Sequence, residues 1–307
     1  MNLKGRDYLT LADFNREELW YLLELARDLK KKQKAGIPHQ ELKGKTLGMI
    51  FQKASTRTRI SFEAGMFHLG GLAMFLSKND LQMGRGEPIE DTARVLSRYV
   101  DGILIRTYSH QEVLDLAKYA DVPVINGLTD DFHPTQALAD LLTIWEKFET
   151  IAGLKLVYIG DGNNMAHSLL LAGALMGMEV TVASPQGYEP NPAIVAKAQS
   201  LAQQPEKIQA VGDPREAVQG AHILYTDVWA SMGQEEEAAE RRKAFAGYQI
   251  NQELLSQAEP EAIVLHCLPA HRGEEISAEV MEGPQSVVFD EAENRLHAHK
   301  AILAALL

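Results

Sequence analysis

The chain has 307 residues, enough for two domains of ordinary size, each with its own hydrophobic core. Its formal charge of -12, from 30 basic and 42 acidic side chains, argues against a surface for nucleic acid or an anionic membrane. The start, MNLKGRDYLTLADF, lacks the apolar core of a signal peptide, and the longest apolar run (169–178) is much shorter than a membrane span. A single cysteine favours a reducing compartment, so we predict a soluble, cytoplasmic protein.

In the first half, short apolar runs rich in Val, Ile and Leu predict buried strands. They are TLGMIF (46–51), LAMFLS (72–77), GILIRT (102–107) and VPVING (122–127). Segments of helical periodicity separate them, a pattern typical of parallel sheets with both faces covered by helices. An amphipathic segment then runs from Pro134 to about Phe148, with proline at a favoured first helical position. We predict that this helix bridges two lobes.

The second half repeats the alternation. Its predicted strands are LKLVYIG (154–160), MEVTVAS (178–184), HILYTDV (222–228) and AIVLHCLP (262–269). The closing segment predicts a terminal helix over about 290–307, and the charged stretch QEEEAAERRK (234–243) predicts a solvated helix or loop edge. The fold class is therefore α/β, with two doubly wound parallel-sheet domains, 1–150 and 151–289. We expect a ligand cleft between them, the bridging helix and the terminal helix as links, and the terminal helix packed on the first domain.

Polar side chains follow the predicted strands at their carboxyl ends. They are Ser55, Arg106, His133, Asn164, Asp227 and Cys267. In open parallel sheets this edge is where ligands bind, so two such edges facing each other would form one site.

The stretch STRTR (55–59) predicts an anion site. If Ser55 caps the following helix, the first-turn N-H groups and the helix dipole favour a phosphate there, with hydroxyls from Thr56 and Thr58 and a forked guanidinium from Arg57. Arg59 diverges from Arg57 on a helix, so we assign it a structural role. The alternative is a capped helix with surface arginines.

The segment FHPTQALAD (132–140) places His133 before a helix and Gln136 one turn later. A neutral imidazole there could donate to a carbonyl oxygen that becomes negative during a reaction, as Arg106 could. The alternative is a histidine that caps its own helix.

Taken together, STRTR, the strand-end Arg106 and HPTQALAD resemble the transcarbamoylase family, which moves a carbamoyl group from carbamoyl phosphate to an amine. In the second half, DVWASMG (227–233) and HCLPAHRGEE (266–275) resemble its ornithine branch, whereas the aspartate branch carries an HPLPR-type segment. The resemblance spans nearly the whole chain.

The resemblance implies a set of site residues. Those for carbamoyl phosphate are Ser55, Thr56, Arg57, Thr58, Gln82, Arg106, His133, Gln136, Cys267, Leu268 and Arg295. Those for ornithine are Asn164, Asp227, Ser231 and Met232. The chain reads GDGNN where many relatives read DARNN, which leaves Asn163 open for the carboxylate, but Asn164 is favoured. Cys267, Arg106 and His133 would be catalytic. In related enzymes the Gln82 position contacts carbamoyl phosphate from a neighbouring subunit.

The implied reaction joins carbamoyl phosphate and L-ornithine to give L-citrulline and phosphate, in arginine metabolism and most simply in biosynthesis. It needs no cofactor or metal, and the family forms homotrimers or multiples of trimers. Neither nucleic acid nor membrane is an expected partner. Three alternatives remain open: transfer to another amine such as putrescine, a non-catalytic regulatory relative, and a dehydrogenase. GDGNNM (160–165) fits the last poorly, because Met165 occupies the third glycine position of GxGxxG. Cys267 has its own alternative, a small buried hydrophobe.

Overall fold

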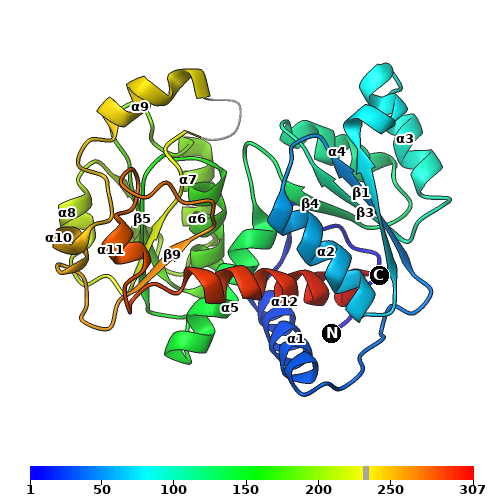
Figure 1. Ribbon diagram of the computed structural model, residues 1–307, viewed down its shortest axis with the longest axis horizontal. Coiled ribbons are helices and arrows are strands. Elements are labelled where there is room, and N and C mark those ends of the chain that lie inside the picture. Colours follow the sequence, from blue (N-terminus) through cyan, green and yellow to red (C-terminus); the bar gives the residue numbers. More distant parts are fainter. Residues whose placement is uncertain (231–234) are drawn as a thin grey trace. The chain divides into compact units, whose positions relative to one another are not determined.

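The structure, a computed structural model, describes residues 1–230 and 235–307 (Figure 1). The chain divides into two compact units: Met1–Leu142 with Glu293–Leu307, and Thr143–Ala292. We call these the first and the second unit. The division falls within two helices, α5 (Pro134–Phe148) and α12 (Val288–Leu306).

The first unit contains a parallel sheet with strand order β2-β1-β3-β4. Its strands are β1 (Thr46–Phe51), β2 (Leu72–Ser77), β3 (Gly102–Arg106) and β4 (Val124–Leu128). Its helices are α1 (Arg16–Lys34), α2 (Thr56–His68), α3 (Ile89–Leu96) and α4 (His110–Tyr119), with 3-10 turns at Leu11–Asp13, Lys78–Asp80 and Gln82–Arg85. Phe51 of β1 lies opposite Arg106 of β3, so the carboxyl ends of these two strands are level.

Both faces of this sheet are covered. On one face, Ile103 and Ile105 of β3 share a buried cluster with Ala93 of α3 and Val113 of α4. The other face carries the end of α12, because a Cβ at Gly102 would lie 3.1 Å from the Leu307 side chain. The helix α12 also lies beside α2, where Gly65 lets the Lys300 side chain approach closely (Figure 1).

The second unit contains a parallel sheet with strand order β7-β6-β5-β8-β9 among its described residues. The strands are β5 (Lys155–Ile159), β6 (Glu179–Ala183), β7 (Ile208–Val211), β8 (Ile223–Thr226) and β9 (Ile263–His266). The helices are α6 (Asn164–Met176), α7 (Pro192–Leu201), α8 (Pro214–Ala217), α9 (Ala238–Ala244), α10 (Gln252–Leu255) and α11 (Ala278–Met281), with 3-10 turns at Pro205–Lys207 and Glu235–Glu237. The predicted strands are confirmed to within three residues at each end, but β7 was missed.

Helices lie on both sides of this sheet as well (Figure 1). Val157, Leu224 and Val264 of three strands share a buried cluster with residues of α8, α10 and α11. On the other face, Gly173 of α6 lies so close to β6 that a Cβ would be 2.1 Å from the Val180 side chain. The predicted fold class, two parallel α/β domains, is confirmed.

The strand orders create a switch point in each sheet. The chain leaves β1 for β2 on one side and returns to β3 on the other; it leaves β5 for β6 and β7 and returns to β8. Connections therefore diverge above the carboxyl ends of β1 and β3, and of β5 and β8. In doubly wound sheets these are the places where ligands bind.

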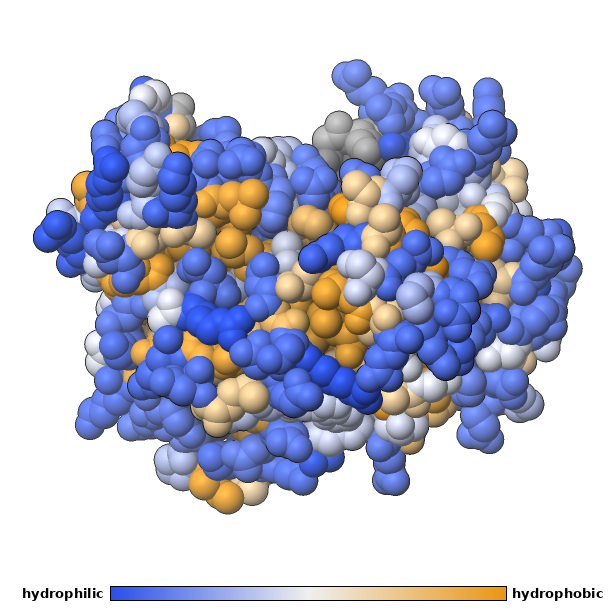
Figure 2. All heavy atoms as spheres, turned by 180° about the vertical axis from the view of Figure 1, so that it is seen from behind, coloured by the Kyte–Doolittle hydropathy of each residue, from blue (hydrophilic) through white to orange (hydrophobic). Residues whose placement is uncertain are grey.

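None of the described helices combines the length and the apolar character that a membrane span requires. On the face shown in Figure 2, hydrophilic residues predominate and hydrophobic ones form several patches between them.

A lysine is buried where α12 meets α1. The Lys300 side chain is fully buried, and its ammonium donates to the Leu29 carbonyl at 3.3 Å, to Gln33 Oε1 at 2.7 Å and to His39 Nε2 at 3.1 Å. Burial lowers the pKa of Lys300 from 10.5 to about 8, against a raising effect of Glu41. A lowering of this size costs the folded state on the order of 3 kcal/mol at neutral pH.

Replacing Lys300 by methionine should raise the free energy of unfolding at pH 7 by about 1–2 kcal/mol, because the charge penalty exceeds the loss of the hydrogen bonds. Since the folded pKa lies below the unfolded one, the unfolded chain binds more protons between pH 8 and 10.5, and wild-type stability gains from this group as pH rises through that window. Urea unfolding of both proteins at pH 7, 8.5 and 10 should show the advantage of the methionine variant shrinking and then reversing, because the wild type regains about 2–3 kcal/mol over this range. A constant difference would contradict the assignment.

Candidate active site

The start of α2 forms the predicted cap. Ser55 has extended backbone angles, and its Oγ accepts a hydrogen bond from the Thr58 N-H at 3.1 Å. Thr56 and Arg57 occupy the first turn, where N-H groups point beyond the helix end and favour an anion. Because β1 ends at Phe51, this helix start lies directly after the carboxyl end of the strand.

Arg295 of α12 joins two other predicted residues at this site. Its guanidinium donates from Nη2 to Thr58 Oγ1 at 2.8 Å and from Nη1 to Gln136 Oε1 at 2.7 Å. Gln136 in turn donates to Asp140 Oδ1 at 2.8 Å. All four side chains are buried, so the network is rigid and shielded from water.

His133 lies in a cationic environment. Burial, and then the charges of Arg295, Arg106 and Arg57, hold the pKa of His133 well below its ordinary value of 6.5. The imidazole is therefore neutral at physiological pH, and a neutral ring still offers one N-H donor. Three guanidinium groups that all act on one buried, neutral histidine produce a strongly positive local field, which suits a multiply charged anion.

Two residues of the first unit lie outside this network. Arg59 forms an ion pair with Glu63 at 3.0 Å and stacks over the Phe75 ring at 3.7 Å, as its predicted structural role requires. Gln82 is exposed in the 3-10 turn Gln82–Arg85, outside the hydrogen-bond network that Arg295 forms among the described residues.

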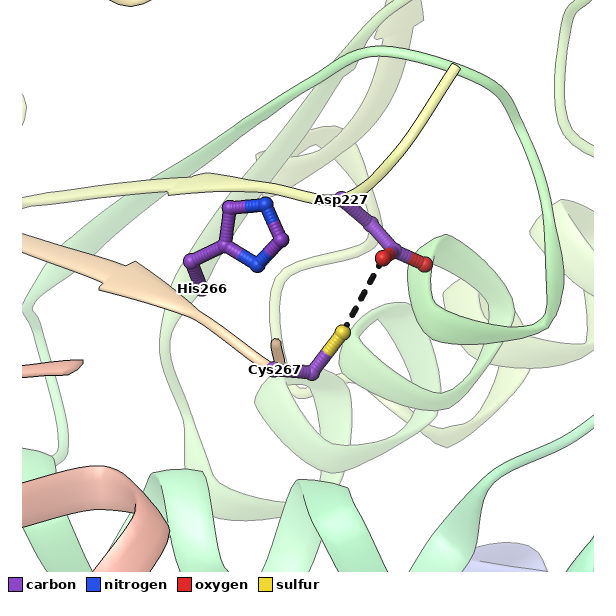
Figure 3. Close-up of side chains that lie close together, drawn as sticks. All are labelled: Asp227, His266 and Cys267. Carbon is purple, nitrogen blue, oxygen red and sulfur yellow. Dashed lines mark hydrogen bonds between the residues drawn. The ribbon is translucent and has the colours of Figure 1, made fainter. Parts of the chain in front are cut away.

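In the second unit, Asp227 follows β8 and Cys267 follows β9. The Cys267 thiol donates to Asp227 Oδ1 at 3.1 Å, as Figure 3 shows. The Val228 N-H donates to the same oxygen at 2.8 Å, and Asn163 Nδ2 donates to Oδ2 at 3.0 Å. These three donors are all neutral, while the carboxylate is only 7% exposed. A cationic ligand would supply the missing countercharge.

His266 lies beside Asp227 and Cys267, a grouping that resembles a metal site. Its Nδ1 accepts from the Leu268 N-H at 2.9 Å, which leaves Nε2 to donate to Glu275 Oε1 at 2.9 Å. Because both nitrogens are engaged, the imidazole offers no lone pair to a metal. Leu268 has a φ of 59°, an unusual value for a bulky residue, and the bond to His266 holds it there.

The two asparagines after β5 differ in their contacts. Asn163 caps α6: its Oδ1 accepts from the Met165 and Ala166 N-H groups and from the Tyr158 hydroxyl, while its Nδ2 binds Asp227. Asn164 is the first helical residue. Gly162 permits this turn, since a Cβ there would lie 2.1 Å from the Pro190 nitrogen. The contacts of Asn163 are those of a structural residue.

Sequence reasoning missed an ion pair near this edge. Arg241 of α9 is buried, although the charged stretch that contains it was expected to be solvated; it donates to Asp161 Oδ2 and to the Trp229 carbonyl, both at 2.9 Å. Burial raises the pKa of Asp161 to about 6 even beside this guanidinium. The only signal in the sequence was the spacing of Arg241 from Glu237, which it also binds at 3.0 Å. Ser231 and Met232, predicted to contact ornithine, lie outside the described residues.

The fold and the two clusters describe a two-domain α/β protein with a cluster of arginines around a buried histidine in one unit and a buried carboxylate with neutral donors in the other. Two family descriptions match the chain: "Aspartate/ornithine carbamoyltransferase, carbamoyl-P binding domain" over residues 6–146 and "Aspartate/ornithine carbamoyltransferase, Asp/Orn binding domain" over residues 152–306. The chain belongs to the aspartate/ornithine carbamoyltransferase family, and the resemblance seen in its motifs is confirmed.

Individual relatives agree. An ornithine carbamoyltransferase of Symbiobacterium thermophilum is 62% identical over 306 residues, covering 99% of both chains. An anabolic ornithine carbamoyltransferase of Pyrococcus furiosus is 58% identical over 308 residues, covering 100% of this chain and 98% of that protein. The solved structure of ornithine carbamoyltransferase from Pyrococcus furiosus superposes with a TM-score of 0.96 at 57% identity, covering 100% of this chain and 98% of that chain.

Proposed function

We propose that this protein transfers the carbamoyl group of carbamoyl phosphate to the side-chain amine of L-ornithine, forming L-citrulline and phosphate. The observation that carries the proposal is the positive field of Arg57, Arg106 and Arg295 around the neutral, buried His133. Arg57, Arg106 and His133 lie within residues 6–146, whose family description names carbamoyl phosphate binding, and Arg295 belongs to the same compact unit. The relatives named above are ornithine carbamoyltransferases, which supports ornithine as the acceptor.

In the first unit, the phosphate of the donor would bind at the start of α2, with Ser55, Thr56, Arg57 and Thr58. The carbamoyl end would lie against Arg106, His133, Gln136 and Arg295. A neutral imidazole and a guanidinium both donate hydrogen bonds, so they stabilise the oxyanion that forms when the carbonyl carbon is attacked. Leu268 and Cys267 would border the transferred group from the second unit, and Gln82 would reach it from a neighbouring subunit.

In the second unit, Asp227 would hold the amine of ornithine and Asn164 its carboxylate, with Ser231 and Met232 over the amino acid. We prefer Asn164 because Asn163 is engaged at both ends of its amide. The side-chain amine has a solution pKa near ~10.4 and must lose a proton before it attacks. Attack forms the new C-N bond, and collapse of the intermediate breaks the C-O bond to phosphate. The reaction requires both half-sites to face one cleft, which we propose as well.

The decisive assay measures carbamoylated product from carbamoyl phosphate with ornithine, putrescine, N-acetylornithine and aspartate in parallel. We expect product with ornithine alone. Comparable rates with putrescine would contradict ornithine as the specific acceptor. They would also remove the role of Asn164, since putrescine has no carboxylate. No product with any amine would contradict transferase activity.

Cys267 is a testable part of the acceptor site. Its replacement by alanine should preserve the fold, since the side chain is half-buried, but should raise KM for ornithine and lower kcat, together by about tenfold in kcat/KM. The reason is that the thiol donates to Asp227 Oδ1 and orients the carboxylate. Steady-state kinetics with ornithine varied would measure this, and unchanged kinetics would remove Cys267 from the site.

We further propose a homotrimer, or a multiple of it, acting in the cytoplasm in arginine biosynthesis. Large apolar side chains of the first unit are exposed: Ile60, Phe67, Leu72 and Tyr99. Exposed apolar surface of this kind favours association, and a neighbour would also supply the Gln82 contact. Light scattering coupled to gel filtration measures the mass; a monomer would contradict the proposal. The word anabolic in the name of one relative supports the biosynthetic direction.

A further inference from the structure

The terminal helix contains a buried histidine that the residues assigned above do not include. His299 is completely buried, and its ring stacks on Phe62 of α2 with centroids 3.9 Å apart and an interplanar angle of 17°. Its two nitrogens contact Ser61 Oγ at 2.8 Å and Arg295 Nε at 3.4 Å. It therefore bridges the helix that begins the anion site and the arginine that completes it.

Chemistry fixes which group donates and which accepts in each of these hydrogen bonds. A guanidinium donates only, so His299 Nε2 accepts from Arg295 and the ring proton must reside on Nδ1. Nδ1 then donates to Ser61 Oγ, whose own proton goes to the Arg57 carbonyl at 2.6 Å. Burial and the Arg295 charge hold the pKa of His299 well below its ordinary value, which keeps this tautomer neutral.

We infer that His299 is a positioning residue: through its Nδ1-H tautomer it fixes the Arg295 guanidinium on Thr58 and Gln136 and ties it to the first turn of α2. The bond from Nε to His299 at 3.4 Å adds a third point of attachment to those of the two terminal nitrogens, at 2.8 and 2.7 Å, and so restrains the tilt of the guanidinium plane. The inference rests on the proposed function, because Arg295 matters to kinetics only if carbamoyl phosphate binds there.

The test compares His299→Gln with His299→Leu. A glutamine amide has a donor and an acceptor with nearly the spacing of the two imidazole nitrogens, so it can donate to Ser61 and accept from Arg295 at the same time. Leucine fills the space but forms neither hydrogen bond. We expect His299→Leu to raise KM for carbamoyl phosphate about tenfold with KM for ornithine unchanged, and His299→Gln to restore it to within about threefold of wild type.

A matched control lies on the same helix. His297 is also buried but contacts Glu293 at 3.4 Å and is absent from the network, so His297→Leu should leave both KM values unchanged. Should His299→Leu not fold, Ser61→Ala provides the second variant, with an expected rise in KM for carbamoyl phosphate of about threefold.

Crystal structures of the two His299 variants give a readout that is independent of activity. We expect Arg295 to leave Thr58 or Gln136 in the leucine variant and to stay in the glutamine variant. Three results would each overturn the inference. They are an Arg295 that has not moved in the leucine variant, a glutamine variant that does not restore binding, and equal rises in both KM values. If wild type makes no citrulline, the proposed function fails, while the position of Arg295 still decides this inference.

Discussion

Replacing Arg57 by lysine is expected to lower kcat/KM for carbamoyl phosphate by about 10²-fold while KM for ornithine stays within about twofold of wild type. Lysine keeps the charge but loses the planar fork that can bind two phosphate oxygens at once. Arg57 lies in the first turn of α2, where the N-H groups of the helix end, capped by Ser55, favour an anion. The geometry of the fork, rather than net charge, should therefore limit the variant.

Arg59→Lys is the control for this experiment. Arg59 lies two residues further along the same helix and is engaged with Glu63 and Phe75, so its replacement should leave both KM values unchanged. Initial rates with each substrate varied in turn at saturation of the other measure both variants. Equal losses for the two substrates in Arg57→Lys would contradict a phosphate site confined to the first unit.

The strands were predictable because each is a short apolar run between polar segments. The predicted bounds of β1, β2 and α5 coincide with the structure. The missed strand β7 shows the limit of this signal: in IQAV only Ile208 is buried, and Gln209 and Ala210 are exposed. An edge strand that is covered on one face only has no continuous apolar run, so the sequence pattern does not reveal it. It is recognised in the structure by its pairing with β6.

The positions of candidate site residues were predictable where these residues end a strand or follow it within a few residues, since parallel strands bring their carboxyl ends to one edge. Ser55, Arg106, Asp227 and Cys267 all belong to this group. Contacts between distant segments were not predictable. Ser61 and His299 are 238 positions apart, and Asp161 and Arg241 are 80 apart. Helical periodicity places such residues on a buried face but does not say which partner the tertiary fold brings to them.

Charged residues illustrate the same point. Arg241 belongs to a run of charges that is typical of a solvated helix, and only tertiary structure supplies the buried Asp161 that draws it inward. Lys300 likewise lies on the buried face of an amphipathic helix, where the pattern alone predicts an apolar residue. A buried charge with a distant partner, or with neutral partners only, is invisible to composition because the compensating groups are not neighbours in sequence.

Replacing Asp227 by asparagine is the counterpart to the Arg57 experiment. We expect kcat/KM for ornithine to fall by about 10²–10³-fold, the effect of removing one partner from a desolvated charge pair. The carboxylate accepts from Cys267, Val228 and Asn163, which are all neutral, so in the proposed complex the amine supplies the positive charge that these donors lack. An amide would also present a donor to one of these donors, which disturbs the orientation of the site.

Binding of carbamoyl phosphate supplies the internal control for Asp227→Asn. Thermal shift on addition of carbamoyl phosphate should match wild type, because Arg57, Arg106 and Arg295 are unchanged and belong to the other unit. Kinetics with ornithine varied at saturating carbamoyl phosphate then report the acceptor site alone. Arg57→Lys should therefore impair the use of carbamoyl phosphate, and Asp227→Asn should impair the use of ornithine. If either variant impaired both substrates equally, the two clusters would not each recognise one substrate.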